Sequence, residues 1–288
     1  MAIGGRSVNN WRITPTHKVS DMFRFRWYSA VFLALSSSIA YADDWVVSSG
    51  VTFHDTTSTQ PGASYRDRGS SINAFASTQV EAWTLGGGLN YGLSTVDVNS
   101  GGYSRPASTS GVVMAARDIG NGRTISATLG YGNTAIDSSL ISGGTTTSYT
   151  AKSSFLSSSV GLTQSIVLSR RSQVTLSVRY TGISSRSDPY TNSAGSTTPS
   201  SDASFGFASF GAGFSHRFGR FTPYISADWN VSNKDFVPNT GNKDYFSINT
   251  GLNYRLDAKT NLGLSFATTA NKAYSHDNTL GASIRVSF

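Results

Sequence analysis

Apolar and polar residues alternate one by one along most of the chain beyond residue 42. The alternation is clearest at residues 125–131, 174–180 and 246–254. Successive side chains of an extended strand point to opposite faces, so this period of two predicts strands with one apolar and one polar face. No segment shows a competing helical period. The chain is therefore predicted to be all β.

The predicted strands are separated alternately by very short and by long connections. The short ones are tight turns, such as residues 118–122 and 219–220, and the long ones are rich in Gly, Ser, Thr and Asn, as at 185–203. This spacing predicts about twelve strands in a single antiparallel up-and-down barrel. They are expected near residues 44–54, 71–81, 83–95, 109–118, 123–136, 154–168, 172–184, 204–218, 220–232, 244–256, 260–271 and 279–288.

Short turns at one end and long polar loops at the other are typical of a barrel that spans the bacterial outer membrane, with the turns and both termini in the periplasm. A soluble β-sandwich is the alternative, because its strands have the same period of two. Aromatic residues at or near the ends of the apolar faces favour the membrane barrel, which carries interfacial girdles there. These aromatic residues are Tyr131, Tyr180, Phe218, Phe221, Tyr254 and Phe288.

The composition also favours strands as the membrane-spanning elements. Only 38% of the residues are hydrophobic, and no apolar run reaches the length of about 18 residues that a spanning helix requires. A spanning strand needs only about 9–11 residues. The chain has no cysteine, which excludes disulfides and thiolate metal sites.

The net charge of +7 is concentrated in the N-terminal segment. Residues 1–42 hold five of the 23 basic residues and one of the 16 acidic residues. The remainder therefore carries 18 basic against 15 acidic residues, a net charge of +3. This distribution removes the main argument for nucleic acid as a partner.

Residues 22–42 have the three parts of a secretory signal peptide. A basic segment at 23–26 precedes a short apolar stretch, and Ala40 and Ala42 form an Ala-x-Ala cleavage site. Cleavage after Ala42 would leave residues 43–288 as the barrel. Residues 1–21 are polar and patternless, so we expect an over-called start with Met22 as the true initiator, or an extended leader as the alternative.

The last nine residues alternate without a break and end on an aromatic side chain. This ending resembles the final strand of outer-membrane β-barrels, whose terminal Phe and alternating apolar residues are the signal for the barrel-assembly machinery. The resemblance implies that machinery and periplasmic chaperones as partners, with outer-membrane lipid and lipopolysaccharide around the barrel. The residues expected to carry the signal are Leu280, Ala282, Ile284, Val286 and Phe288.

Further segments resemble the C-terminal translocator domain of autotransporters, a twelve-stranded barrel. They are residues 85–92, 118–123, 129–132, 221–224 and 280–288. Members of that family carry a passenger and a helical linker before the barrel, whereas Trp45 here opens the first predicted strand directly after the signal peptide. The expectation is a stand-alone barrel that acts as a passive narrow pore or as a scaffold for its loops.

Three histidines beyond the leader raise the alternative of an outer-membrane hydrolase. Consecutive residues on a strand point apart, so the run Ser-His-Asp at 275–277 is not a catalytic triad as it stands. A hydrolase would need His54 or His276 to meet an acid and a nucleophile at the rim, and His216 has the position of an interfacial residue. We predict no catalytic, cofactor or metal site, and a surface adhesin remains a further alternative.

Four arginines are expected to face inward at the periplasmic mouth of the barrel. Each lies within a few residues of a turn or of the chain end, on the face opposite the apolar one. A ring of arginines around a narrow opening favours anions. Alternatively, they bond to turn carbonyls or to Asp118 and Asp257. The four are Arg117, Arg217, Arg255 and Arg285.

Overall fold

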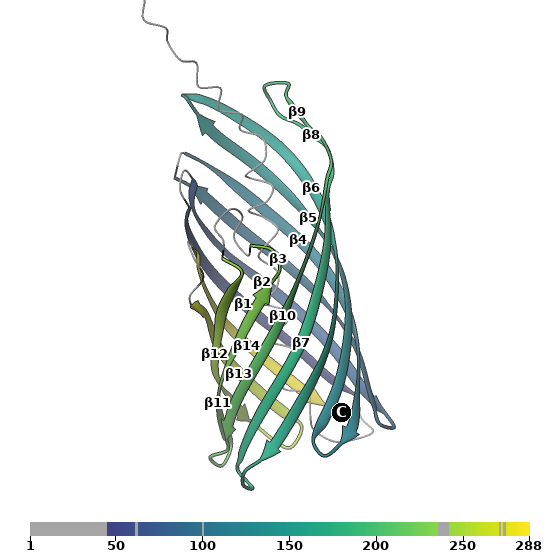
Figure 1. Ribbon diagram of the computed structural model, residues 1–288. Helices are drawn as coiled ribbons and strands as arrows, with labels where there is room; N and C mark the ends of the chain where they lie inside the picture. The colour runs from purple at the N-terminus through teal and green to yellow at the C-terminus, as the bar shows by residue number, and fades with distance from the viewer. Residues whose placement is uncertain (1–44, 61–62, 100, 236–241, 271, 273–274) are drawn as a thin grey trace, which may run out of the picture.

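The structure is a computed structural model that describes residues 45–60, 63–99, 101–235, 242–270, 272 and 275–288 (Figure 1). The predicted leader, with Ala40 and Ala42, lies outside the described residues. Among those residues no helix is long and apolar enough to cross a membrane. The described strands form one closed barrel and one small hairpin.

The strands differ widely in length. They are β1 (Val46–Gln60), β2 (Ala63–Val80), β3 (Trp83–Val98), β4 (Gly102–Gly120), β5 (Arg123–Ser142), β6 (Thr145–Val167), β7 (Ser172–Ser187), β8 (Tyr190–Thr191), β9 (Thr197–Thr198), β10 (Ser201–His216), β11 (Phe221–Ser232), β12 (Asp244–Arg255), β13 (Thr260–Ala270) and β14 (Ser275–Ser287).

Twelve of the described strands form the barrel, in which each pairs antiparallel with the next barrel strand along the chain, β7 with β10, and β1 pairs with β14 to close it. The closing ladder runs from Val46 opposite Ser287 to Ser58 opposite Ser275. Closure gives every barrel strand a partner on both edges, which a lipid environment demands because it offers backbone groups no water to bond. The prediction of an all-β up-and-down barrel of about twelve strands is confirmed.

Several strands reach further at one end than the alternation of the sequence predicts. β1 ends at Gln60 and β2 begins at Ala63, whereas the sequence places these ends near residues 54 and 71. The polar connection at 185–203 likewise carries the hairpin of β8 and β9. Both faces of these outer segments are polar, so the period of two disappears while the backbone ladder continues.

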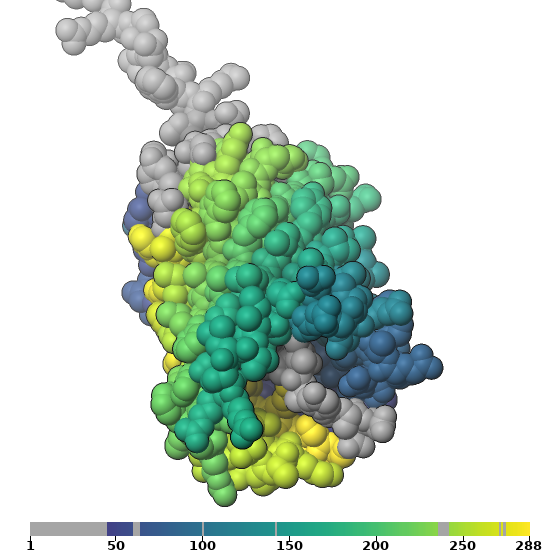
Figure 2. Space-filling model, turned by 60° about the horizontal axis from the view of Figure 1, so that its bottom comes forward, coloured from purple at the N-terminus to yellow at the C-terminus, as the bar shows by residue number. Residues whose placement is uncertain are grey.

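Tight turns close the opposite end of the barrel, which we call the turn end (Figure 1, bottom). Between β4 and β5 only Asn121 and Gly122 lie outside the strands, with φ of 54° and 72°. Two consecutive positive φ angles are those of a type I′ hairpin, for which Asn-Gly is a preferred sequence. Figure 2 brings this end forward and shows the turns after β6 and β10, in teal and green, projecting from it.

The turn between β12 and β13 is held by a carboxylate. Asp257 Oδ1 accepts hydrogen bonds from the backbone amides of Lys259 at 2.8 Å and Thr260 at 2.7 Å. These two bonds stabilise the ionised form and hold the pKa of Asp257 below its usual range.

The barrel has its large apolar side chains on the outside. Leu89 is 70% exposed and Ile72 is 62% exposed, whereas the inward hydroxyl of Ser104 is fully buried. Exposed aromatic side chains, among them Trp45, Trp83 and Phe218, lie at the turn end of this belt. A continuous apolar exterior with an aromatic edge is the surface of a protein that spans a lipid bilayer.

Alternate residues of the last strand lie on this outer face. Leu280, Ile284 and Phe288 are all exposed, and Ala282 lies between them on the same face. Val286 has the same direction but is half-buried. The apolar face expected for the C-terminal segment is therefore present, while its role in assembly stays a prediction.

Candidate functional site

The inward faces of the barrel strands line a lumen, and this lumen is the candidate functional site. Its wall carries many hydroxyl and amide side chains that bond to one another between neighbouring strands, and it also carries a buried apolar cluster in which Phe205 and Tyr245 pack against Ile183 and Phe207. The hydroxyls of Thr52 and Ser71 lie 2.6 Å apart, and Ser209 donates to Asn230 Oδ1 at 2.7 Å. The outer positions are occupied by apolar residues, so strand alternation directs these polar groups inward.

Two opposite charges share the lumen wall across β10. Arg179 of β7 lies opposite Ser209, and Asp228 of β11 lies opposite Gly211, two residues further along the same face. A Cβ atom on Gly211 would overlap Asp228 Oδ1. The glycine therefore provides the space that the carboxylate occupies, and the guanidinium and the carboxylate attract each other.

This charge pair was not predicted from the sequence. Arg179 interrupts one of the clearest alternating segments, at 174–180, on its polar face. That position was a usable signal for a lumen charge. The sequence contains no such signal for Asp228 on β11, because the two residues come close only through the register of β10, which lies between their strands.

Two of the predicted mouth arginines lie together on the lumen face at the turn end. Arg255 of β12 and Arg285 of β14 are both directly opposite Asn261 of β13, so they flank this residue. Arg217 follows the last residue of β10, and its Nη2 donates to the backbone carbonyl of Arg170 at 3.4 Å. The expected alternative, a bond to a turn carbonyl, therefore holds for Arg217.

The fourth mouth arginine faces the other way, so the prediction for Arg117 is wrong. Arg117 lies opposite Trp83, and its guanidinium carbon is 5.4 Å from the centre of that exposed ring on the outer face. Residues 112–116 are all apolar, so alternation does not indicate an inward direction in this strand. The buried side chains of Met114 and Ala116 show which face is inward.

The aspartates expected as alternative partners of the arginines bond to backbone amides of their own turns. Asp118 Oδ1 accepts from the amide of Gly120 at 2.8 Å, as Asp257 does from Lys259 and Thr260. Both carboxylates therefore shape turns.

One histidine does meet an acid in the lumen. His54 Nε2 of β1 lies 3.4 Å from Oδ1 of Asp67, a fully buried residue of β2. A Cβ atom on Gly69 would lie 2.5 Å from the imidazole Cε1, so this glycine leaves the space for the ring. The adjacent Asp55 faces outward and binds Arg66, so sequence adjacency did not identify the acid that meets His54.

The other two described histidines lie away from this pair. His276 is exposed, while its neighbours Ser275 and Asp277 are turned to the inner face, so the Ser-His-Asp run is divided between the two faces. His216 packs on Phe218, with 4.2 Å between ring centres, and its Nδ1 lies 2.8 Å from the hydroxyl of Ser172. Within the described chain no group of three or more His, Cys, Asp or Glu side chains could hold a metal ion.

The apolar exterior, the closed ladder and the inward polar side chains define a transmembrane β-barrel of the bacterial outer membrane. The chain belongs to the autotransporter β-domain family, whose model, described as "Autotransporter beta-domain", matches residues 45–275. Barrels of this family lie in outer-membrane lipid and are generally not catalytic. No curated protein is detectably similar to the chain in sequence.

Several solved translocator barrels have the same fold. The translocator domain of the autotransporter NalP from Neisseria meningitidis is 16% identical, with a TM-score of 0.80 over 93% of this chain and 96% of that chain. The β-domain of the Bordetella autotransporter BrkA is 16% identical, with a TM-score of 0.70 over 85% and 100%. The transport unit of AIDA-I from Escherichia coli is 14% identical, with a TM-score of 0.62 over 88% and 93%.

Proposed function

We propose that the barrel is a passive, narrow passage across the outer membrane. The observation that supports this function is the set of hydroxyls, amides and the pair of Arg179 and Asp228 that a closed barrel turns inward. Water and small ions need such a lining, since an apolar wall excludes them. A barrel of this strand number has room for a small pore.

Arg255 and Arg285 give this passage a preference for anions. They flank Asn261 on the lumen face, within a few residues of the turn end, where an entering ion meets them first from the periplasm. Charged side chains at a narrow mouth select ions of opposite sign because the nearby low-dielectric wall strengthens their field.

Single-channel recording in planar lipid bilayers tests both statements. The wild-type protein is expected to conduct, with a reversal potential under a KCl gradient that indicates an anion preference. The double variant Arg255→Gln, Arg285→Gln is expected to shift this potential toward cations. The matched control is Arg117→Gln, which removes the same type of charge from the outer face and is expected to leave the potential unchanged.

Two results would contradict the proposal. A folded barrel that conducts no ions rejects the passage. A conducting barrel whose reversal potential is the same in the wild type and the double variant rejects the role of the two arginines and leaves the passage standing.

Display of the surface opposite the turns is a second candidate function, supported by the hairpin of β8 and β9. This hairpin rises beyond the barrel strands (Figure 1). It is held against β6 by a stacked pair, Tyr149 and Tyr190, with 4.6 Å between ring centres, and by the amide of Ser193 donating to the Ser148 carbonyl at 2.8 Å. Deleting residues 190–198 is expected to abolish any cell binding without affecting barrel folding.

We expect no enzymatic activity from this chain. His54 and Asp67 lie on the inner face of the barrel, and the carboxylate is fully buried. A substrate would therefore have to enter the lumen to reach them. His54→Ala is accordingly expected to leave any lipid or peptide turnover of the preparation unchanged.

The proposed partners are those of an outer-membrane barrel. Periplasmic chaperones would deliver the unfolded chain, and the barrel-assembly machinery would insert it by means of its last strand. Lipopolysaccharide would surround the folded barrel, and nucleic acid is not expected as a partner.

A further inference from the structure

The outer face of the barrel changes from apolar to charged beyond the lipid-facing belt. On β1 the outward series passes from Phe53 directly to Asp55, and on β3 it passes from Leu93 through Thr95 to Asp97. On β2, which runs in the opposite direction, Ile72 is preceded on the same face by Ser70 and then by Arg68. The change from apolar to charged residues lies at the end of the barrel away from the turns, where the headgroups of the outer leaflet begin.

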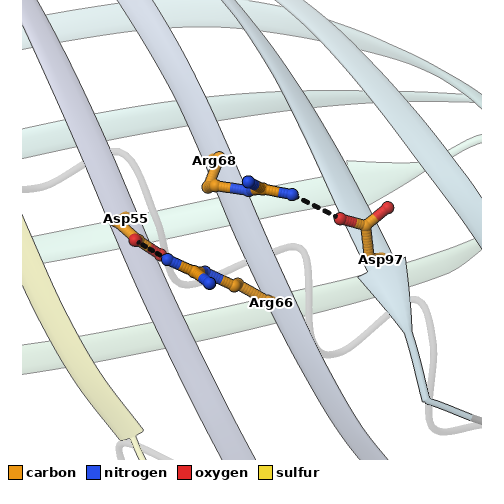
Figure 3. A network of polar contacts seen from close by, with 4 residues as sticks. All are labelled: Asp55, Arg66, Arg68 and Asp97. Atoms are coloured by element: carbon orange, nitrogen blue, oxygen red, sulfur yellow. Dashed lines mark hydrogen bonds and ion pairs between the residues drawn. The ribbon is translucent and has the colours of Figure 1, made fainter.

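Four of these charged residues form a network across three strands (Figure 3). Arg66 donates to both carboxylate oxygens of Asp55, with 2.9 Å between Nε and Oδ1. Arg68 donates from Nη2 to Oδ2 of Asp97 at 3.0 Å. Arg66 is directly opposite Asp97, and Arg68 is directly opposite Asp55, so the two ion pairs belong to one patch.

A third arginine borders this patch on β4. Tyr103 is directly opposite Asp97, and the guanidinium carbon of Arg105 lies 4.6 Å from the centre of the Tyr103 ring. Arg105 is exposed on the same outer face. On its other side Arg105 is directly opposite Asp137 of β5, whose carboxylate accepts a hydrogen bond from the hydroxyl of Thr150. We call the three residues Arg66, Arg68 and Arg105 the arginine patch.

The ion pairs orient Arg66 and Arg68 without using all of their hydrogen-bonding capacity. Asp97 accepts from one nitrogen of Arg68, and a guanidinium carries further N–H groups in the same plane. The side chains of Arg66 and Arg68 are 52% and 58% exposed, so a second acceptor can approach them. Exposed pairs of this type contribute little to stability, which leaves recognition as a better reason for such an ordered arrangement.

We propose that the arginine patch docks the phosphate groups of the glycolipid that forms the outer leaflet of the membrane. Guanidinium groups match phosphate oxygens with paired hydrogen bonds, and basic residues beside a membrane attract anionic headgroups. The patch gives the proposed lipopolysaccharide surroundings a particular binding site, and its role does not depend on whether the lumen conducts.

The surface below the arginine patch favours a lipid over a free anion. Phe53, Ile72 and Leu93 are exposed apolar side chains on the same strands, only a few residues toward the turn end. A molecule with phosphate at one end and acyl chains at the other can contact both surfaces together. Inorganic phosphate can use only the arginines.

Lipid binding to the purified full-length protein in detergent tests this site. The probes are bisphosphorylated lipid A and the same lipid without its phosphates, and bound lipid is counted by native mass spectrometry. The wild type is expected to bind the phosphorylated form about tenfold more tightly, since charge-assisted hydrogen bonds to the phosphates are made only by that form. The triple variant Arg66→Gln, Arg68→Gln, Arg105→Gln is expected to lose this preference.

The matched control removes three arginines from the turn end, as Arg123→Gln, Arg170→Gln, Arg220→Gln, and is expected to keep the preference. If the control loses it equally, or the patch variant keeps it, the site is rejected. Equal binding of both lipids by the wild type assigns binding to the acyl chains alone. If inorganic phosphate displaces the phosphorylated lipid at the same phosphate concentration, the site binds a free anion and not a lipid. Either this displacement or equal binding of both lipids overturns the proposal.

Heat-modifiable migration in gels verifies that the patch variant is folded. Should it fail to fold, Arg105→Gln and Arg68→Gln are tested singly, because each leaves the pair of Arg66 and Asp55 in place. Each is expected to reduce the preference severalfold. An unchanged preference in both rejects the site.

Discussion

The backbone amide of Phe288 donates a hydrogen bond of 2.9 Å to the carbonyl oxygen of Trp45. The last residue of the chain is thereby joined to the start of the first strand, at the seam where β1 and β14 close the barrel. The side chain of Phe288 is 60% exposed and points outward. Its ring is therefore accessible to another molecule, while its backbone completes the seam.

This separation of roles predicts the effect of Phe288→Ala. The variant is expected to reach the outer membrane as folded barrel in lower amount, because the outward aromatic ring is the proposed contact with the barrel-assembly machinery. The barrels that do fold should unfold at nearly the wild-type temperature, since the backbone hydrogen bond is retained. Heat-modifiable gel migration of membrane fractions measures the yield, and thermal unfolding of the purified protein measures stability.

Phe218→Ala is the matched control for this experiment. Phe218 is 59% exposed at the same end of the barrel but is not terminal. Equal loss of yield in both variants would show that any interfacial aromatic has this effect, and the assembly role of Phe288 would be rejected.

The barrel could be predicted from the sequence because lipid imposes a strict requirement on one face of every strand. At residues 174–180 each outward position is apolar and each inward one is polar. The sequence of this segment therefore indicates both where the strand lies and which way its side chains point. All twelve barrel strands have their expected place for this reason. The requirement ends where the strand leaves the lipid, which is why the predicted β1 ended too early and the predicted β2 began too late in the sequence.

The candidate site was less predictable because its residues depend on direction and register. Arg117 follows the run of apolar residues at 112–116, where alternation cannot distinguish the two faces, and its stacking on Trp83 is known only from pairing. Arg179 and Asp228 are separated by a full strand between them, so their meeting requires the register on both sides of β10. Alternation alone specifies neither the direction of Arg117 nor the register on the two sides of β10.

The hairpin turn between β4 and β5 predicts a strong effect of Gly122→Ala. Gly122 has φ of +72°, and a Cβ atom there would lie 2.5 Å from the backbone oxygen of Ser165, which cannot move aside easily. The substitution is expected to lower the free energy of unfolding by about 3 kcal/mol, the upper part of the range for a strained backbone site. Urea unfolding in detergent, followed by tryptophan fluorescence, measures this loss.

Gly143→Ala separates the two causes of that strain. Gly143 also has a positive φ of +57°, but no atom lies within 4 Å of the position that a Cβ atom would take. Only the cost of the left-handed conformation remains, so the expected loss is about 1 kcal/mol. If both variants lose the same amount, the contact with Ser165 contributes nothing.

The turn at Asp257 predicts a loss of stability in acid. Hydrogen bonds from the amides of Lys259 and Thr260 lower the pKa of Asp257, so its stabilising contribution is fully present above the ordinary value of 3.8. The contribution disappears as pH falls through the lowered pKa of the folded state. Unfolding measured over a pH series should therefore show a steeper acid decline in the wild type than in Asp257→Asn.

Lys259→Ala is the control for the acid effect. It removes a neighbouring positive charge but retains the backbone amide that donates to Asp257. The acid decline is expected to be the same as in the wild type, because the hydrogen bonds are the main cause of the lowered pKa. A decline as shallow as that of Asp257→Asn would instead assign the effect to the lysine charge.

The pair of Arg179 and Asp228 predicts opposite changes in the selectivity of the lumen. Asp228→Asn leaves the arginine charge uncompensated and is expected to shift the reversal potential under a KCl gradient toward anions. Arg179→Gln leaves the carboxylate and is expected to shift it toward cations. The double variant should lie near the wild type, because both charges are then absent. Equal potentials in the two single variants would show that ions do not pass beside this pair.

Gly211→Val tests whether the position of the carboxylate matters as well as its charge. The new side chain would occupy the space that Asp228 Oδ1 now fills, and it would also overlap the hydroxyl of Ser177. Both neighbouring atoms end flexible side chains, so the wall is expected to remain folded while the carboxylate moves away from Gly211. A shift of the reversal potential without any change in net charge would follow from this movement, whereas an unchanged potential would show that only the number of lumen charges counts.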